Sequence, residues 1–260
     1  MALVATSFGS VEVEQMGHGR DLVLLHSLLT DRTAFDLVRE PLARRSRLTL
    51  VHLPGYGLSA PSGSTVEDYA DRVAAVLDAL KLPRTTDVLG NGLGGFVALG
   101  LAIRHGARFD RLIVVDALAG FPEAGKVPLR TLAQVVQAQG MAAALDTAVR
   151  RMFNPPYIAA HPDVIDERKR VLQNMDAVNF AKLCVALTNV EFEALLPQIR
   201  NRTLVMAGAQ DQTTAPALVR KVAAGIPGAR FMEIESSGHC PQIEQPVRFV
   251  EILEEFLSQG

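Results

Sequence analysis

Continuous apolar runs that end in glycine or polar residues recur along this chain and restrict the fold that it can adopt. Asp21–His26 (DLVLLH) and Leu48–Leu53 (LTLVHL) are of this kind, and three more runs follow, at Thr86–Gly90, Arg111–Asp116 and Arg202–Gly208. Strands of a parallel sheet are apolar along their whole length because helices cover both faces. The runs therefore predict a mostly parallel sheet, preceded by an alternating strand over Ala2–Gln15 and a turn at 16–19.

Segments of helical length separate these runs. Val66–Leu80 repeats its apolar residues every three to four positions, and Thr65 is suited to cap its start. Strands that alternate with helices are typical of a doubly wound α/β fold, whose ligand site lies beyond the carboxyl ends of the strands. Only helical patterns occur between about 121 and 198. We therefore expect residues 1–120 and 199–260 to form the α/β core, and residues 121–198 to form a helical cap that walls off a pocket.

Composition limits the class of protein. At 260 residues, with 48% hydrophobic and 21% charged residues, the chain fits one large globular domain. Its net charge of -2, with both signs mixed, provides no basic stripe for nucleic acid. Two cysteines make no disulfide framework, and neither an export signal nor an apolar stretch of about 18 residues is recognisable. We expect a cytoplasmic monomer or homodimer with a small-molecule substrate and no nucleic acid or membrane partner.

The most specific local motif is a glycine cluster between a strand and an apolar helix, GNGLGG at residues 90–95. Here the chain resembles the α/β-hydrolase superfamily, whose nucleophile elbow is G-x-S-x-G in a strand–turn–helix context. Gly90 and Gly94 match the outer glycines, but Gly92 stands where that family has its nucleophilic serine. The cluster also fits the dinucleotide motif G-x-G-x-x-G. Its position after several strands, with only Asp116 near the expected place for ribose, speaks against that alternative.

The resemblance extends along the chain and implies further site residues. Asp211 follows a late strand, where the family has its acid, and His239 precedes the last helix, where the family has its base. The order of elbow, acid and histidine is that of the family. The loop at 26–29 resembles the oxyanion loop, which implies the backbone N–H groups of Leu28 and Leu93 as donors. The segment GHCPQIEQP, together with Asn91, is similar to enol-lactonases and to hydrolases that cleave carbon–carbon bonds in ring-fission products.

Ser27 and Asn91 are the side chains that we expect to contact substrate. Ser27 is also the best-placed replacement nucleophile, although a loop hydroxyl more often bonds its own backbone. Cys240 directly follows His239, and because successive side chains usually point apart we interpret it as a packing residue. The other histidines lack the spacing of metal ligands, so we expect no metal and no cofactor.

Loss of the serine hydroxyl removes covalent catalysis at that position and leaves the other parts in place. Asp211 and His239 can still act as a general base, and the oxyanion donors can still stabilise negative charge. Three explanations fit Gly92: a serine replaced to trap substrate, a natural serine-free enzyme, or a non-catalytic protein that binds a small ligand. We predict a hydrolase-like enzyme acting on a small, largely apolar ester, lactone or enol/keto acid, with room beside His239 for a water molecule.

Overall fold

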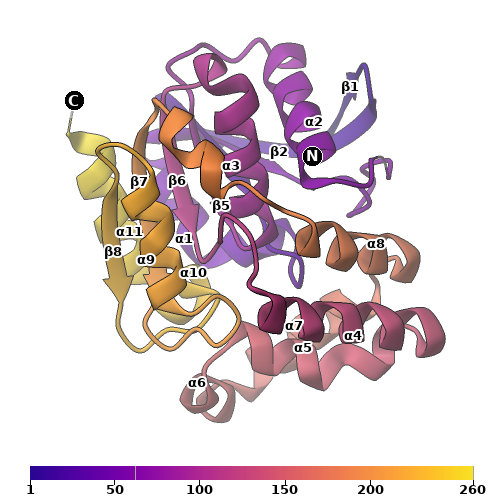
Figure 1. Cartoon of the computed structure of the whole chain (residues 1–260). Helices are drawn as coiled ribbons and strands as arrows, with labels where there is room; N and C mark the ends of the chain where they lie inside the picture. The colour runs from indigo at the N-terminus through magenta and orange to yellow at the C-terminus, as the bar shows by residue number, and fades with distance from the viewer. Residues whose placement is uncertain (62, 260) are drawn as a thin grey trace.

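An eight-stranded sheet forms the centre of the computed structural model, which describes residues 1–61 and 63–259 (Figure 1). The spatial order of the strands is β1-β2-β4-β3-β5-β6-β7-β8. Their bounds are β1 Ala2–Thr6, β2 Gly9–Gly17, β3 Arg20–Leu25, β4 Ser46–Val51, β5 Asp87–Asn91, β6 Arg111–Val115, β7 Arg202–Gly208 and β8 Arg230–Ile234. The pairs from β4 through β3 to β8 are parallel, so the predicted mostly parallel α/β sheet is confirmed.

The N-terminal segment differs from the prediction. It is not one strand over Ala2–Gln15 but two antiparallel strands, in which Thr6 pairs with Gly9. β2 continues to Gly17 and pairs antiparallel with β4, so the predicted turn at 16–19 begins later. The turn between β1 and β2 was missed because the alternation of side chains in the sequence continues across it. In the structure the side chain of Thr6 accepts a hydrogen bond from the Phe8 N–H and closes a tight local turn.

Helices cover both faces of the sheet. On one face lie α1 (Asp36–Ala43) and α11 (Pro246–Ser258), whose buried side chains pack against Leu22 and Leu24 of β3. On the other face lie α2 (Val66–Ala79), α3 (Leu93–His105) and α9 (Pro216–Gly225). Thr65 caps α2 as predicted, through a reciprocal capping box with Asp68. The short helix α10 (Pro241–Glu244) precedes α11.

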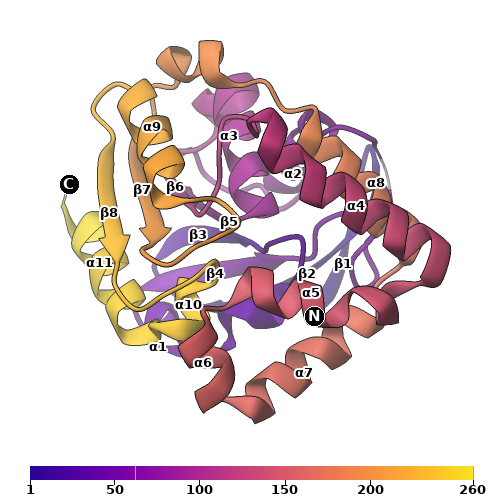
Figure 2. The same cartoon turned by 60° about the horizontal axis from the view of Figure 1, so that its bottom comes forward.

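Five further helices lie between β6 and β7, in the segment for which we predicted a cap. They are α4 Glu123–Gln139, α5 Leu145–Met152, α6 Pro155–Ala160, α7 Pro162–Gln173 and α8 Ala177–Thr188; short 3-10 turns occur at Arg32–Phe35, Gly106–Arg108, Met141–Ala144 and Glu193–Gln198. In Figure 1 the arrows of β7 and β8 point toward this group, and Figure 2 brings the group forward. We propose that it caps the carboxyl ends of the strands. No helix among the described residues is long and apolar enough to cross a membrane.

Candidate active site

The turn between β5 and α3 keeps the geometry of a nucleophile elbow. Gly92 has φ 53° and ψ -120°, its N–H donates to the Val115 carbonyl at 2.9 Å, and its own carbonyl accepts the Phe96 N–H at 3.0 Å. A Cβ on Gly90 would overlap backbone atoms of Gly94. The outer glycines are therefore required for the close approach of strand and helix, and the central glycine adopts a left-handed conformation without a side-chain penalty.

Asp211 and His239 form a buried, hydrogen-bonded pair. Asp211 Oδ2 lies 2.7 Å from His239 Nδ1, and both residues are 4% exposed. Burial alone would raise the pKa of Asp211, but the charge of His239 and hydrogen bonds from His239, Thr214 and Thr213 hold that pKa below its ordinary value. An ionised Asp211 fixes the proton of His239 on Nδ1 and leaves Nε2 free to accept a proton.

The loop that carries His239 is fixed from two sides. The His239 N–H donates to the Met152 carbonyl at 3.0 Å, and its carbonyl accepts a hydrogen bond from Asn91 Nδ2 at 3.0 Å. Gln242 Nε2 in turn donates to Asn91 Oδ1 at 3.0 Å. Asn91 is fully buried and does not line the cavity beside His239. Its contacts position His239, and the substrate contact that we expected for it stays a prediction without support from this geometry.

Glu244 joins this loop to the segment between α5 and α6. Its carboxylate accepts the backbone N–H groups of Asn154 at 2.9 Å and Gly238 at 2.7 Å, and the Ser237 hydroxyl at 3.2 Å. Burial outweighs these hydrogen bonds and raises the pKa of Glu244 to about 7. Burial also raises the pKa of the Cys240 thiol well above its ordinary value, which fits the packing role predicted for it.

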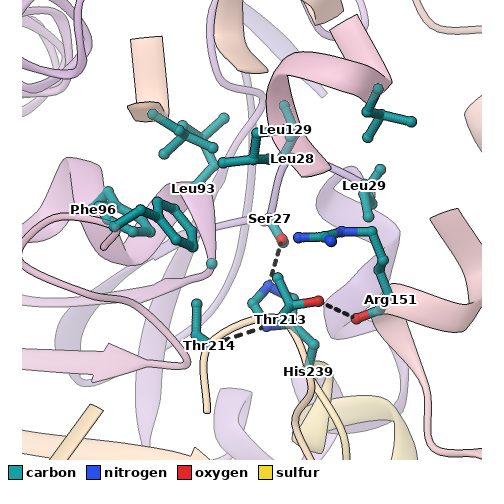
Figure 3. A pocket seen from close by; sticks show the side chains of 14 residues that line it. Ser27, Leu28, Leu29, Leu93, Phe96, Leu129, Arg151, Thr213, Thr214 and His239 are labelled. Atoms are coloured by element: carbon teal, nitrogen blue, oxygen red, sulfur yellow. Dashed lines mark hydrogen bonds between the residues drawn. The ribbon is translucent and has the colours of Figure 1, made fainter. Parts of the chain in front are cut away.

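Ser27 lies against Gly92, and its hydroxyl takes up the space directly at the Gly92 Cα. A Cβ built on Gly92 would overlap Ser27 Oγ and would lie 2.8 Å from His239 Nε2. Ser27 Oγ is itself 3.4 Å from His239 Nε2, and Figure 3 shows this contact as a dashed line. The space left by the missing serine side chain is therefore filled by a serine hydroxyl from another loop.

Leu28 and Leu93, the two residues whose backbone N–H groups we expect to hold an oxyanion, line the same cavity. Leu93 is the first residue of α3, and Leu28 lies in the loop after β3; both line the cavity. Neither N–H donates a hydrogen bond to any of the residues that the structure describes. The Leu28 carbonyl accepts the Tyr56 hydroxyl at 2.8 Å, which fixes that peptide. Free N–H groups at a helix start are suited to stabilise an oxyanion.

The cavity is small and mostly apolar. Its volume, measured as the space open to the centre of a water molecule, is about 30 Å³, which is room for one or two waters. Its apolar wall consists of Leu28, Leu29, Leu93, Phe96, Phe121, Leu129, Leu132 and Leu187, and its other residues are Ser27, Gly92, Arg151, Thr213, Thr214 and His239. Residues of α4, α5 and α8 contribute to it, so the segment 121–198 takes part in the site.

Arg151, on α5, extends its guanidinium group into this cavity toward Ser27 (Figure 3). Its side chain makes neither an ion pair nor a hydrogen bond within the part of the chain that the structure describes. Burial lowers the pKa of Arg151. Because a half-buried cation gains most from a negatively charged partner, this group is suited to hold an anionic part of a ligand.

A second carboxyl group stands behind the acid–base pair. Asp116 directly follows β6, and atoms of Asp116, Asp211 and His239 lie within 4.8 Å of one another. Burial, together with the charge of Asp211, raises the pKa of Asp116 well above its ordinary value. Such a trio has the residue types of a metal site. However, Asp211 and His239 are bonded directly at 2.7 Å, whereas an ion holds its ligands at about 2.0–2.2 Å each and separates them further. We interpret the trio as acid–base groups that share protons.

Comparison with known proteins identifies the family of the chain. The profile of the alpha/beta hydrolase family matches residues 22–252. The chain belongs to this family. The hydrolase is 31% identical over 207 residues to 3-oxoadipate enol-lactonase 2 of Acinetobacter baylyi, which covers 79% of this chain and 76% of the relative. It is 30% identical to the pimeloyl-[acyl-carrier protein] methyl ester esterase of Aeromonas hydrophila, over 96% of this chain and 100% of the relative.

Solved structures show the same fold. The enol-lactonase from Burkholderia xenovorans has a TM-score of 0.92 at 26% identity, covering 99% of this chain and 100% of that one. A thermophilic esterase from Thermogutta terrifontis, solved with malate bound, has a TM-score of 0.90 at 26% identity, covering 98% of this chain and 97% of that one. The predicted resemblance is thus confirmed, and the chain is an enzyme of the hydrolase type by its kinship.

Sequence reasoning missed two features of the site. Arg151 was not singled out, because the sequence does not show which face of a cap helix points inward. Thr214 was missed as well; its hydroxyl donates to Asp211 Oδ2 at 2.5 Å. A signal for Thr214 was present, since a hydroxyl three residues after an aspartate in a turn commonly bonds that carboxylate.

Proposed function

We propose that this hydrolase cleaves a small carboxylic ester or lactone, with His239 as general base and Asp211 as the group that orients it. The observation that carries this proposal is a buried base and two unbonded N–H groups, of Leu28 and Leu93, on one small cavity. Ester hydrolysis needs a base to deprotonate the attacking hydroxyl and donors for the oxyanion that forms. Both are present although Gly92 has no side chain.

The substrate that we propose carries a negative charge beside a short apolar acyl group. Arg151 is the only arginine or lysine among the residues that line the cavity, and leucines form most of the wall. One relative is named a 3-oxoadipate enol-lactonase, and one structural neighbour was solved with malate bound. Both named compounds carry a carboxylate. A carboxylate on Arg151 would gain charge-assisted hydrogen bonds and fix the carbonyl near Ser27.

A second candidate function rests on Gly92 alone. A protein that binds a small ligand without converting it has no use for a nucleophile, and the cavity could serve for binding only. Such a protein also has no chemical need for the 2.7 Å pair of Asp211 and His239. The arrangement of that pair, in which an acid orients a base, favours catalysis over binding.

The test is hydrolysis of a panel of short esters and lactones, with and without a carboxylate, by the chain as it stands and by two histidine variants. We expect turnover by the chain and by His18→Ala, which removes an exposed histidine, and no turnover above buffer by His239→Ala. Equal rates for the chain and His239→Ala would contradict the proposal. If no panel member is turned over while a carboxylate raises the melting temperature, the binding function replaces it.

A further inference from the structure

We infer that Ser27 is the nucleophile of this site, a role that rests on the proposed ester or lactone hydrolysis. The hydroxyl of Ser27 occupies the volume in which a side chain on Gly92 would lie. Gly92 and Ser27 are far apart in sequence, on the loops after β5 and β3, yet both line the cavity beside His239. The missing hydroxyl of the elbow is thus supplied by the neighbouring loop.

The backbone of Ser27 and its hydroxyl have different hydrogen-bond partners. Its N–H donates to Thr30 Oγ1 at 3.1 Å, and its carbonyl accepts His26 Nδ1 at 2.9 Å and the Thr30 N–H at 3.3 Å. Burial lowers the pKa of His26 to about 4, so this imidazole stays neutral, donating from Nδ1 while Nε2 accepts the Leu53 N–H at 3.1 Å. The backbone of Ser27 is therefore held on both sides.

The hydroxyl, by contrast, has one partner among the described residues, His239 Nε2 at 3.4 Å. A purely structural serine in a loop usually bonds its own backbone, and Ser27 Oγ does not. The distance is longer than an ordinary hydrogen bond, as is common for catalytic hydroxyls before substrate binds. With Asp211 on Nδ1 and Ser27 on Nε2, His239 has the two neighbours that a nucleophile, base and acid arrangement requires.

The reaction then proceeds in two balanced halves. Ser27 Oγ attacks the carbonyl carbon as its proton passes to His239 Nε2, and the oxyanion is held by the N–H groups of Leu28 and Leu93. The bond to the leaving alkoxide breaks, His239 returns the proton to that oxygen, and an acyl group remains on Ser27. Water, deprotonated by His239, attacks the acyl carbon, and the bond to Ser27 breaks with return of the proton to its Oγ. The products are one alcohol and one acid, from ester and water.

Two alternatives are distinguished by a covalent probe. If His239 activates water directly, no acyl group forms on the chain, and Ser27 is replaceable. An alkyl fluorophosphonate reacts with a serine that a histidine deprotonates: an oxygen–phosphorus bond forms and fluoride leaves. We expect one adduct, located by peptide mass spectrometry on the peptide that contains Ser27, and its absence in Ser27→Ala and in His239→Ala.

The matched control is Ser59→Ala, which removes another buried serine hydroxyl; it donates to the His52 carbonyl at 2.7 Å, accepts the Glu12 N–H at 2.9 Å and does not line the cavity. It should label and hydrolyse esters as the unchanged chain does, whereas Ser27→Ala should lose about 10²-fold or more of kcat/KM with a melting temperature near that of the unchanged chain. Ester turnover without an adduct, or equal turnover by Ser27→Ala, would overturn the role of Ser27 and leave the hydrolase proposal standing. Neither turnover nor adduct would overturn both.

Discussion

The two parts of the candidate site, the Asp211–His239 pair and the Ser27–Gly92 contact, differ in the hydrogen bonds that hold them. On the acid–base side, Asp211 accepts the Thr213 N–H at 2.6 Å and the Thr214 N–H at 3.2 Å, and bonds His239 at 2.7 Å. On the side of the proposed nucleophile, Gly92 offers no side chain, and the Ser27 hydroxyl has one hydrogen-bond partner among the described residues, His239 Nε2 at 3.4 Å. Hydrogen bonds thus hold the proposed base in position before any substrate binds. The Ser27 hydroxyl beside it is held much less and can move more easily.

The largest loss of activity should come from a change in the Asp211–His239 pair. His239→Ala removes the proton acceptor, and a positioned general base contributes about 10²-fold to 10⁴-fold. We expect a loss of kcat/KM of that size on whichever ester the chain hydrolyses fastest, measured by initial rates. Rescue of part of the activity by added imidazole would assign the loss to the base, and a variant that unfolds at the assay temperature would fail that rescue.

Asp211→Asn should cost less, about 10²-fold, because Asp116 lies within 4.8 Å of both other groups and can ionise once Asp211 is neutral. The double variant Asp116→Asn with Asp211→Asn should then lose more than Asp211→Asn alone. Initial rates of the three variants check this. If Asp116→Asn adds nothing to Asp211→Asn, Asp116 has no part in orienting the base.

Arg151 tests the substrate side of the comparison. Replacement of Arg151 by Met should raise KM for a carboxylate-bearing ester about 10-fold to 100-fold, since a hydrogen bond to a charged group is worth about 1.5–3 kcal/mol. KM for a neutral ester of the same length should not rise. Arg150→Met, on the exposed face of α5, is the control. Equal changes for charged and neutral esters would mean that Arg151 only packs.

A side chain added at the elbow should destabilise the chain through Ser27. Gly92→Ser introduces a Cβ that overlaps Ser27 Oγ at a left-handed backbone position, and we expect a loss of about 1–3 kcal/mol in the free energy of unfolding. Adding Ser27→Ala removes the overlap, so the double variant should recover part of that loss. Urea unfolding of the four proteins gives the coupling energy; strictly additive effects would show that the two positions do not share one volume.

The smallest effect on activity is expected at Glu244, where the prediction concerns only the pH dependence of stability. Its pKa is raised to about 7 in the folded chain, from 4.5 when unfolded, so the folded state binds more protons between these values. The resulting stability is present below about pH 4.5 and is lost as the pH rises through about 7, by about 3 kcal/mol for a shift of this size. Thermal melts between pH 5 and 8 should show a smaller slope for Glu244→Gln than for the chain and for the exposed control Glu235→Gln. Equal slopes would contradict this assignment.

The parts of the fold that sequence analysis predicted are those with a strong pattern. The buried strands β3 to β7 are apolar on both faces and end in glycine or polar residues, which fixes their place. β8 (Arg230–Ile234) was not predicted, since it is an edge strand whose residues are mostly half-buried. Its apolar residues Phe231, Met232 and Ile234 neither alternate with polar ones nor form a continuous apolar run, so the segment lacks the pattern of a strand.

The same distinction applies to the site. Gly92 and Asp211 follow the ends of predicted parallel strands, which a sheet brings together, so their proximity was predictable. The place of His239 was implied only by the resemblance to the hydrolase family, because the strand before it was not predicted. The contact of Ser27 with His239 depends on one side-chain rotamer and on the empty volume at Gly92, neither of which a sequence shows. Asn91 was assigned to the substrate for its place beside the elbow, but the alternation of a strand turns its side chain toward the His239 loop.

The most direct measurement compares ester and lactone hydrolysis by the chain as it stands with hydrolysis by the double variant Gly92→Ser with Ser27→Ala. If the acid–base pair of Asp211 and His239 works with the hydroxyl of Ser27, the chain itself turns over at least one short ester, and the double variant, with its hydroxyl moved to the elbow, does so as well. Turnover by the double variant alone would contradict this account. It would show that Asp211 and His239 can activate a serine at position 92, but that the arrangement with Gly92 and Ser27 is not catalytic.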